Sequence, residues 1–182
     1  EKAQPGVMPA DTAWRFIGKL QSNKAKALVK GVPSLVAVET LTSSKLADKL
    51  QAAAAALEPP RAAPLEVYVQ VDTSPWEGTK NGLTVGEAPD VAAHVQANCP
   101  ALRMAGLMTI GAPGDASCFD SLRSCRDAVA ARLDVPPESL ELSMGMSGDF
   151  EAATLAGSTS VRVGSSIFGA RDYPGSTPPP KA

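Results

Sequence analysis

The stretch Leu140-Glu141-Leu142-Ser143-Met144-Gly145-Met146-Ser147-Gly148-Asp149 joins an apolar run of strand length to a turn with two glycines and two serines. A helical pattern follows at 150–156, so the segment predicts a β-strand, a turn and an α-helix. Similar units occur along the chain. Strands are expected at 14–18, 35–39, 65–71, 102–110, 140–144 and 160–164, and helices at 22–29, 44–58, 87–98, 118–133 and 150–156. Repeated β–α units indicate an α/β fold around a parallel sheet.

The periodicity alone does not distinguish a doubly wound sheet from a partial barrel. In both architectures the carboxyl ends of the strands share one face, and ligands bind there. Clusters of Gly, Ser, Asn and Met follow the expected strand ends at 18–23, 108–114, 144–148 and 164–169. We therefore expect a ligand site at this face.

Composition narrows the classes of protein. The chain has 182 residues, 44% of them hydrophobic, and a net charge of −2, which predicts one soluble domain with no basic surface for nucleic acid. Its apolar runs are shorter than the roughly 18 residues that a membrane span needs. Cys99, Cys118 and Cys125 match neither a disulfide framework nor the spacing of zinc ligands. With His94 as the single histidine, no metal site is expected, and His94 itself is expected to be a surface residue.

Two turns have the residues for binding an anion. Both 143–149 and 161–169 lead from a strand toward a helix start, where free backbone N–H groups favour negative charge. The alternative is that both are ordinary capped turns. Arg162 lies inside an otherwise apolar strand, and a buried arginine is unfavourable unless it is paired. Its partner could be a ligand or a carboxylate of a neighbouring strand such as Glu141.

Four segments resemble the pyridoxal phosphate homeostasis proteins, which share the alanine racemase N-terminal barrel. The resemblance is carried by 14–24 (WRFIGKLQSNK), 106–111 (GLMTIG), 143–147 (SMGMS) and 161–173. It implies a (β/α)₈ TIM barrel that binds pyridoxal 5′-phosphate (PLP), has no established turnover, and buffers and delivers the cofactor. It further implies a cytoplasmic protein, monomeric at full length, with PLP-dependent apoenzymes as possible partners and no contact with nucleic acid or membrane.

The resemblance also assigns a cofactor site. Ser147, Gly164 and Ser165 would hold the phosphate, with Met146 beside Ser147, and Arg162 would face the pyridine nitrogen. No residue is expected to be catalytic. A guanidinium, with a pKa above roughly 12, donates a hydrogen bond but does not give up its proton. An unprotonated ring is a poor electron sink, which suits a carrier.

The sequence departs from the family pattern at its beginning. The family holds PLP as a Schiff base on a lysine in a V-A-V-S-K-like strand, followed by an F-G-E-N-like strand, and neither motif is present. Residues 1–173 are therefore expected to form a partial barrel lacking the first two β–α units, and the proline-rich 174–182 a disordered tail. At roughly 30 residues a unit, the chain accommodates six units, against about 250 residues for eight. Arg15 and Lys19 stand where histidines are common in the family.

Further expectations follow from these departures. An open six-stranded sheet is expected to expose two long edges and an apolar interior face. PLP should bind weakly, because the covalent contribution is missing, and any residual adduct is expected first at Lys80. The alternatives left open are a fragment of a racemase-like PLP enzyme and a degenerate scaffold that does not bind the cofactor.

Overall fold

The computed structural model describes residues 8–9, 11–74, 82–112 and 114–169 and contains one parallel sheet. The strands are β1 (Trp14–Phe16), β2 (Leu35–Leu41), β3 (Leu65–Gln70), β4 (Leu102–Met108), β5 (Glu141–Met146) and β6 (Ser160–Arg162). Their spatial order is β1-β2-β3-β4-β5-β6, and every neighbouring pair is parallel. A doubly wound sheet reverses its order at a switch point, whereas a barrel does not. The topology is therefore that of a partial barrel.

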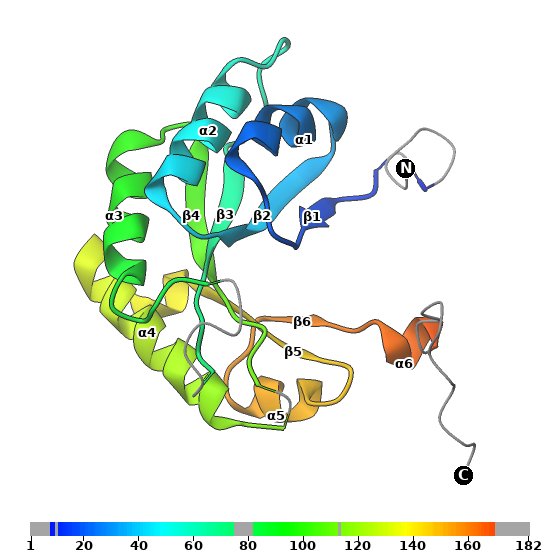
Figure 1. Ribbon diagram of the computed structural model, residues 1–182, viewed down its shortest axis with the longest axis vertical. Helices are drawn as coiled ribbons and strands as arrows, with labels where there is room; N and C mark the ends of the chain where they lie inside the picture. The colour runs from blue at the N-terminus through cyan, green and yellow to red at the C-terminus, as the bar shows by residue number, and fades with distance from the viewer. Residues whose placement is uncertain (1–7, 10, 75–81, 113, 170–182) are drawn as a thin grey trace.

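The α-helices before residue 160 lie on the outer, convex side of this curled sheet (Figure 1). The helices of the described residues are η1 (Ser22–Lys24), α1 (Ala25–Gly31), α2 (Ser44–Ala55), α3 (Ala88–Asn98), α4 (Ser117–Leu133), η2 (Pro137–Ser139), α5 (Phe150–Leu155) and α6 (Ser165–Phe168). The predicted strands and helices are confirmed, with ends shifted by a few residues, and the short η2 and α6 were not predicted. Ser43 caps α2 by accepting a hydrogen bond from the Leu46 N–H at 3.1 Å. None of the described helices is long and apolar enough to cross a membrane.

The main hydrophobic core lies between the sheet and the helices. Each central strand contributes fully buried side chains, among them Val38, Val67, Leu107 and Leu142. The helices contribute Leu46, Leu50, Leu122, Cys125 and Val129 to the same cluster. This apolar layer matches the helical periodicity of the sequence, and burying it is the main favourable term for the fold.

The inner, concave face of the sheet has both polar and apolar side chains. The expected apolar interior is confirmed in part, because Ala37, Tyr68, Ala105 and Met108 form a cluster there, but these side chains are buried and not exposed. Glu39 on β2 and Ser143 on β5 are 1% and 0% exposed, and the Ser143 hydroxyl donates to Glu39 Oε2 at 2.6 Å. These strands are separated by β3 and β4, so the sheet curls tightly enough for inner side chains to touch across it.

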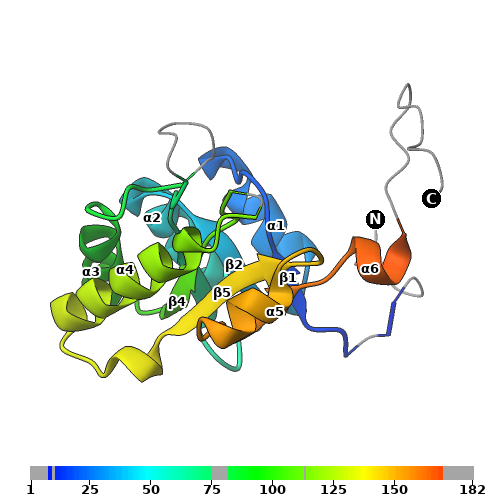
Figure 2. The same ribbon diagram turned by 90° about the horizontal axis from the view of Figure 1, so that it is seen from below.

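The two edges of the sheet are short. The edge strands β1 and β6 have three residues each, so the expected long edges were wrong. α6 follows β6 and stands away from the body of the molecule in both views (Figures 1 and 2). Ile167 and Phe168 in this helix are 67% and 85% exposed. The carboxyl end of β6 is therefore the least covered part of the described structure. The predicted tail at 174–182 lies outside the described residues.

Candidate functional site

The turns after β5 and β6 meet at one hydroxyl group. Ser147 Oγ accepts hydrogen bonds from the backbone N–H of Gly164 at 3.0 Å and of Ser166 at 3.4 Å. The hydroxyl proton of Ser147 remains available for donation in this arrangement. The structure therefore brings together the two turns that the sequence singled out.

The backbone near the carboxyl end of β5 needs a glycine at position 145. Gly145 has φ of +95°, and a Cβ there would lie 2.5 Å from the Ala153 Cβ on α5. Met146, half-buried, follows directly, and its N–H donates to Asp149 Oδ1 at 2.6 Å, which closes the turn. Close packing of α5 against β5 thus fixes where Ser147 lies.

The turn after β6 is open. A Cβ built at Gly164 would have no other atom within 4 Å, and Ser165 beside it is exposed. The Ser147 and Ser165 hydroxyls therefore lie beside free space, and hydroxyl and backbone N–H groups are the donors that a phosphate group requires. Here the Gly164 and Ser166 N–H groups donate to Ser147 Oγ, and they would turn to a phosphate when one is bound. These residues fit the phosphate end of PLP.

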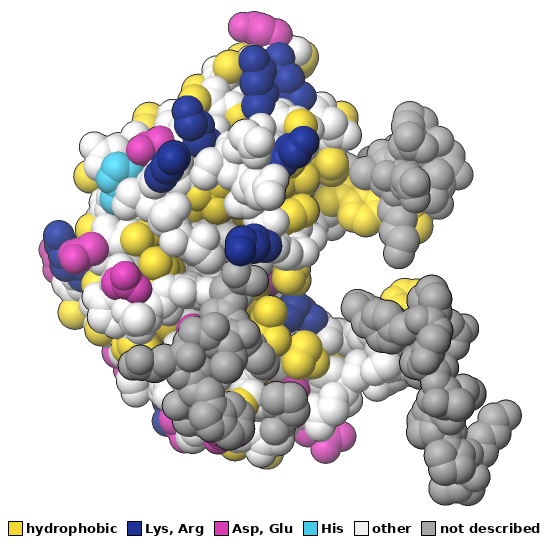
Figure 3. Space-filling view, viewed as in Figure 1, with side chains coloured by type: hydrophobic (Ala, Val, Ile, Leu, Met, Phe, Trp, Pro, Cys, Tyr) yellow, Lys and Arg dark blue, Asp and Glu magenta, His cyan; other side chains and the backbone are white. Residues whose placement is uncertain are grey.

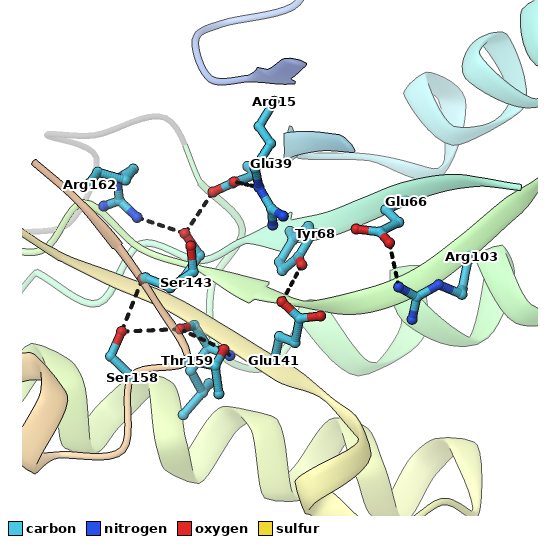
Figure 4. A network of polar contacts seen from close by, with 12 residues as sticks. Arg15, Glu39, Glu66, Tyr68, Arg103, Glu141, Ser143, Ser158, Thr159 and Arg162 are labelled. Carbon is cyan, nitrogen blue, oxygen red and sulfur yellow. Dashed lines mark hydrogen bonds and ion pairs between the residues drawn. The ribbon is translucent and has the colours of Figure 1, made fainter. Parts of the chain in front are cut away.

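Arg162 is held in place by two neutral partners. Its Nη1 donates to Ser143 Oγ at 2.8 Å, and its Nη2 donates to the Thr109 carbonyl oxygen at 2.7 Å (Figure 4). Burial lowers the pKa of this guanidinium, while the charges of Glu39 and Asp149 act to raise it. The side chain keeps its charge at neutral pH because an arginine starts from so high a value.

Glu141 is not the partner of Arg162. The register pairs Arg162 with Met146 near the carboxyl end of β5, whereas Glu141 lies at the amino end of that strand. Glu141 instead accepts a hydrogen bond from the Tyr68 hydroxyl at 2.6 Å. Burial and this carboxylate raise the pKa of Tyr68 far above its usual value.

A row of four polar side chains, Arg15, Glu39, Ser143 and Arg162, crosses the inner face, and we call it the inner polar row (Figure 4). Arg15 Nε lies 2.6 Å from Glu39 Oε1, and the Arg15 guanidinium carbon lies 4.9 Å from the centre of the Tyr68 ring. Glu39 also accepts from Ser143, which in turn accepts from Arg162. The buried carboxylate therefore faces two cations, one directly and one through a hydroxyl.

The sequence did not indicate Glu39 or Ser143 as residues of the site. A carboxylate at the end of the buried run 35–39 was the available signal, because acidic side chains are almost never fully buried without a partner. The partner itself lies 104 residues further along the chain. Only the curl of the sheet brings the two together.

The described lysines lie on the surface of the molecule. Those exposed are Lys19, Lys24, Lys26, Lys30, Lys45 and Lys49. The last four line a groove of about 570 Å³ between α1 and α2, and basic side chains gather over these helices in Figure 3. No described lysine belongs to the inner polar row, and Lys80 lies outside the described residues. The described part of the site therefore holds hydrogen-bond donors but no amine.

The comparisons with known proteins agree with this fold. Residues 16–172 match the model of the alanine racemase N-terminal domain, and the chain belongs to that family. Within it, the chain is 44% identical over 175 residues to the pyridoxal phosphate homeostasis protein of Bos taurus, covering 93% of this chain and 63% of the relative. It is 41% identical to that of Schizosaccharomyces pombe, covering 91% and 68%. The chain is thus a member of the pyridoxal phosphate homeostasis proteins, and it spans about three fifths of the length of the mammalian relatives it matches.

Solved structures confirm the barrel architecture. PipY of Synechococcus elongatus without PLP matches with a TM-score of 0.74 and 29% identity, covering 92% of this chain and 75% of PipY. PipY with PLP bound matches with a TM-score of 0.67 and 28% identity over the same shares. Alanine racemase of Clostridium difficile 630 matches at 0.61 with 14% identity, covering 87% of this chain and 40% of the racemase, which supports the fold alone.

Proposed function

We propose that this chain binds pyridoxal 5′-phosphate and that the protein serves intracellular PLP homeostasis by buffering and delivering the cofactor. The observation that carries the proposal is the convergence of the Gly164 and Ser166 N–H groups on the Ser147 hydroxyl, beside Arg162. Further support comes from relatives that are named pyridoxal phosphate homeostasis proteins and from PipY, whose structure has been solved with PLP bound.

The phosphate is bound by the two turns. Ser147 and Ser165 supply hydroxyl groups, and the backbone of Gly164 comes close because it carries no side chain. Hydrogen bonds to a charged phosphate each contribute roughly 1.5 to 3 kcal/mol, more than bonds between neutral groups. The phosphate is therefore the part of PLP that these residues recognise most strongly, with Met146 packing beside it.

Arg162 faces the pyridine nitrogen and donates a hydrogen bond to it. When bound, PLP supplies an electron sink, and it does so best with a protonated ring. An arginine does not transfer its proton, so it leaves the ring unprotonated. Ser143 and the Thr109 carbonyl hold the guanidinium in place, and Glu39 holds Ser143. This arrangement disfavours carbanion chemistry and favours a carrier.

This 182-residue chain binds PLP weakly and without a covalent bond, because no lysine lies in the described part of the site. Titration of the full chain with PLP, followed by equilibrium dialysis, tests the proposal. We expect saturable binding that Ser147→Ala weakens about tenfold, or about 1.4 kcal/mol. Gly164→Ala should weaken it similarly, because the new methyl group enters the space over the turn.

The matched control is Ser139→Ala, which removes an exposed serine hydroxyl before the amino end of β5, whereas both turns follow the carboxyl ends of their strands. It should leave the affinity for PLP unchanged, and pyridoxal without phosphate should bind at least tenfold more weakly than PLP. Equal affinities of wild type, Ser147→Ala and Gly164→Ala would contradict the assigned site. A single lysine adduct after borohydride reduction would contradict the non-covalent mode and would be sought first at Lys80.

The absence of turnover, the cytoplasmic location, delivery to apoenzymes and a monomeric full-length protein are parts of the same proposal. The relatives are named homeostasis proteins, which favours a carrier over the racemase-like alternative. Incubation of the chain with PLP and L-alanine should produce no D-alanine above the level formed by PLP alone. Racemisation that depends on Ser147 would overturn the carrier assignment.

A further inference from the structure

Three metal-ligating side chains meet on the outside of the barrel, away from the inner polar row. They are Asp48 on α2, His94 on α3 and Cys99 directly after α3, and their donor atoms all lie within 4.8 Å of one another. Asp48 and His94 are 46 residues apart in the sequence. In Figure 3, histidine and acidic side chains lie together on the face formed by these helices.

The three donor atoms lie within 4.8 Å of one another, so small side-chain movements would bring them to the spacing of a tetrahedral ion. Zinc–ligand bonds of roughly 2.0 to 2.3 Å place neighbouring ligand atoms about 3.3 to 3.6 Å apart. His94 Nε2 lies 2.7 Å from Asp48 Oδ1. To bind the same ion, these two atoms would have to move apart by less than about 1 Å. The Asp48 side chain is 58% exposed and is free to make this adjustment by rotation.

The buried donor is held firmly by the backbone. The Cys99 N–H donates to the Val95 carbonyl at 3.0 Å, and the Cys99 carbonyl accepts from the Leu102 N–H at 2.9 Å. The Gln51 side chain on α2 accepts from the Ala101 N–H at 2.7 Å, which ties the segment after α3 to α2. The thiol is therefore fixed relative to the helix that carries Asp48.

We propose that Asp48, His94 and Cys99 bind one Zn²⁺ ion, with water as the fourth ligand. Thiolate and imidazole together select zinc over magnesium and calcium, which prefer oxygen ligands alone. Sequence spacing did not indicate this site, because its ligands come from two helices and match no linear motif. The proposed zinc site does not depend on PLP binding, and its test is run without PLP.

The His94 ring contacts a side chain of its own helix. The Asn98 side-chain amide donates to the His94 carbonyl oxygen at 3.2 Å and lies 3.3 Å from His94 Nδ1. His94 Nε2 lies on the other side of the ring, against Asp48. Binding of an ion through Nε2 therefore has to replace the His94–Asp48 hydrogen bond and release its proton.

The test uses Co²⁺ as a spectroscopic probe for Zn²⁺. Titration of the full chain with Co²⁺, without PLP, should produce a thiolate-to-cobalt charge-transfer band at a stoichiometry of one, and added Zn²⁺ should abolish the band. Cys99→Ser should eliminate it. Cys125→Ser changes another buried cysteine, on α4, whose thiol donates to the Val85 carbonyl oxygen and which is not part of the cluster, and it should retain the band.

The variant His94→Gln keeps the test valid if Cys99→Ser fails to fold, because His94 lies at the surface. We expect Zn²⁺ to raise the melting temperature of wild type, and His94→Gln and Asp48→Asn each to weaken the apparent Zn²⁺ affinity at least tenfold. A charge-transfer band that persists without Cys99, or an affinity unchanged by His94→Gln, would overturn the site. Failure of wild type to bind either ion would do so as well.

Discussion

The outer and inner faces of the curled sheet are built by different interactions. On the outer face, aliphatic side chains of β2 to β5 pack against the helices and leave almost no surface exposed. On the inner face, a buried carboxylate, two arginines and a serine are joined by hydrogen bonds across the sheet. The outer face depends on area removed from water, whereas the inner face depends on every polar group keeping its partner.

This difference separates stability from function within one sheet. Apolar packing tolerates many side chains of similar volume, so the outer face defines the architecture without defining a ligand. The inner face and the two open turns hold directional donors at fixed positions, and those donors define the proposed site. Changes to the two faces should therefore have different consequences.

The largest effect is expected on the outer face. Leu107→Ala removes a fully buried side chain from β4 and should lower the free energy of unfolding by about 3 kcal/mol, because a cavity remains. Leu155→Ala, at a position 91% exposed, should change it by less than about 0.5 kcal/mol. Urea denaturation followed by circular dichroism measures both, and similar losses would contradict the packing described for the outer face.

The next effect concerns the inner face. Glu39→Ala leaves Arg15 without its ion pair and Ser143 without its acceptor, and should destabilise the fold by about 2 kcal/mol. This is below the range for a fully buried pair, because Arg15 is one-third exposed.

The matched control for Glu39 is Glu66→Ala on the adjacent strand β3. Glu66 pairs with Arg103 at the same N–O distance of 2.6 Å, but the two side chains are 26% and 50% exposed. Glu66→Ala should therefore lower the free energy of unfolding by less than about 1 kcal/mol. Equal losses for the two variants in urea denaturation would show that the inner polar row contributes no more to stability than an exposed ion pair does.

The smallest effect concerns pH and a thiol of the outer layer. Burial raises the pKa of Cys125 to about 11 from its ordinary value of 9.0. Between these two values the unfolded chain loses the proton while the folded chain keeps it, so stability falls as pH rises. The loss should be about 1 kcal/mol at pH 10. The difference in unfolding free energy between wild type and Cys125→Ala should change by this amount from pH 8 to pH 10, and a constant difference would refute it.

Much of the fold followed from local patterns in the chain. The six strands and the helices between them were predictable because apolar periodicity reports which face of each element is buried. The short α6 was missed because one turn of helix has no periodicity to detect. Periodicity also could not distinguish a doubly wound sheet from a barrel, since strand order is a property of the packed sheet.

The candidate site was predictable in part. Ser147, Gly164 and Arg162 stood out because glycine, serine and a lone arginine are unusual at the ends of apolar strands. The resemblance to a family assigned their roles. Of the two partners considered for Arg162, the ligand stays a prediction and Glu141 was wrong, because Glu141 lies on the neighbouring strand but not at the same level in the register. Glu141 lies at the amino end of β5, and the side chain that accepts a hydrogen bond from Arg162 is that of Ser143.

The sequence by itself determined the elements, the two serine- and glycine-rich turns and the family, because these depend on residue types at short range. Only the tertiary structure decided that Glu39 meets Ser143 and that Asp48 meets His94 and Cys99. These residues lie far apart in the chain, and their meeting depends on how strongly the sheet curls and how its helices pack. Curvature and helix packing arise from the sum of many side-chain contacts, so no single motif carries them.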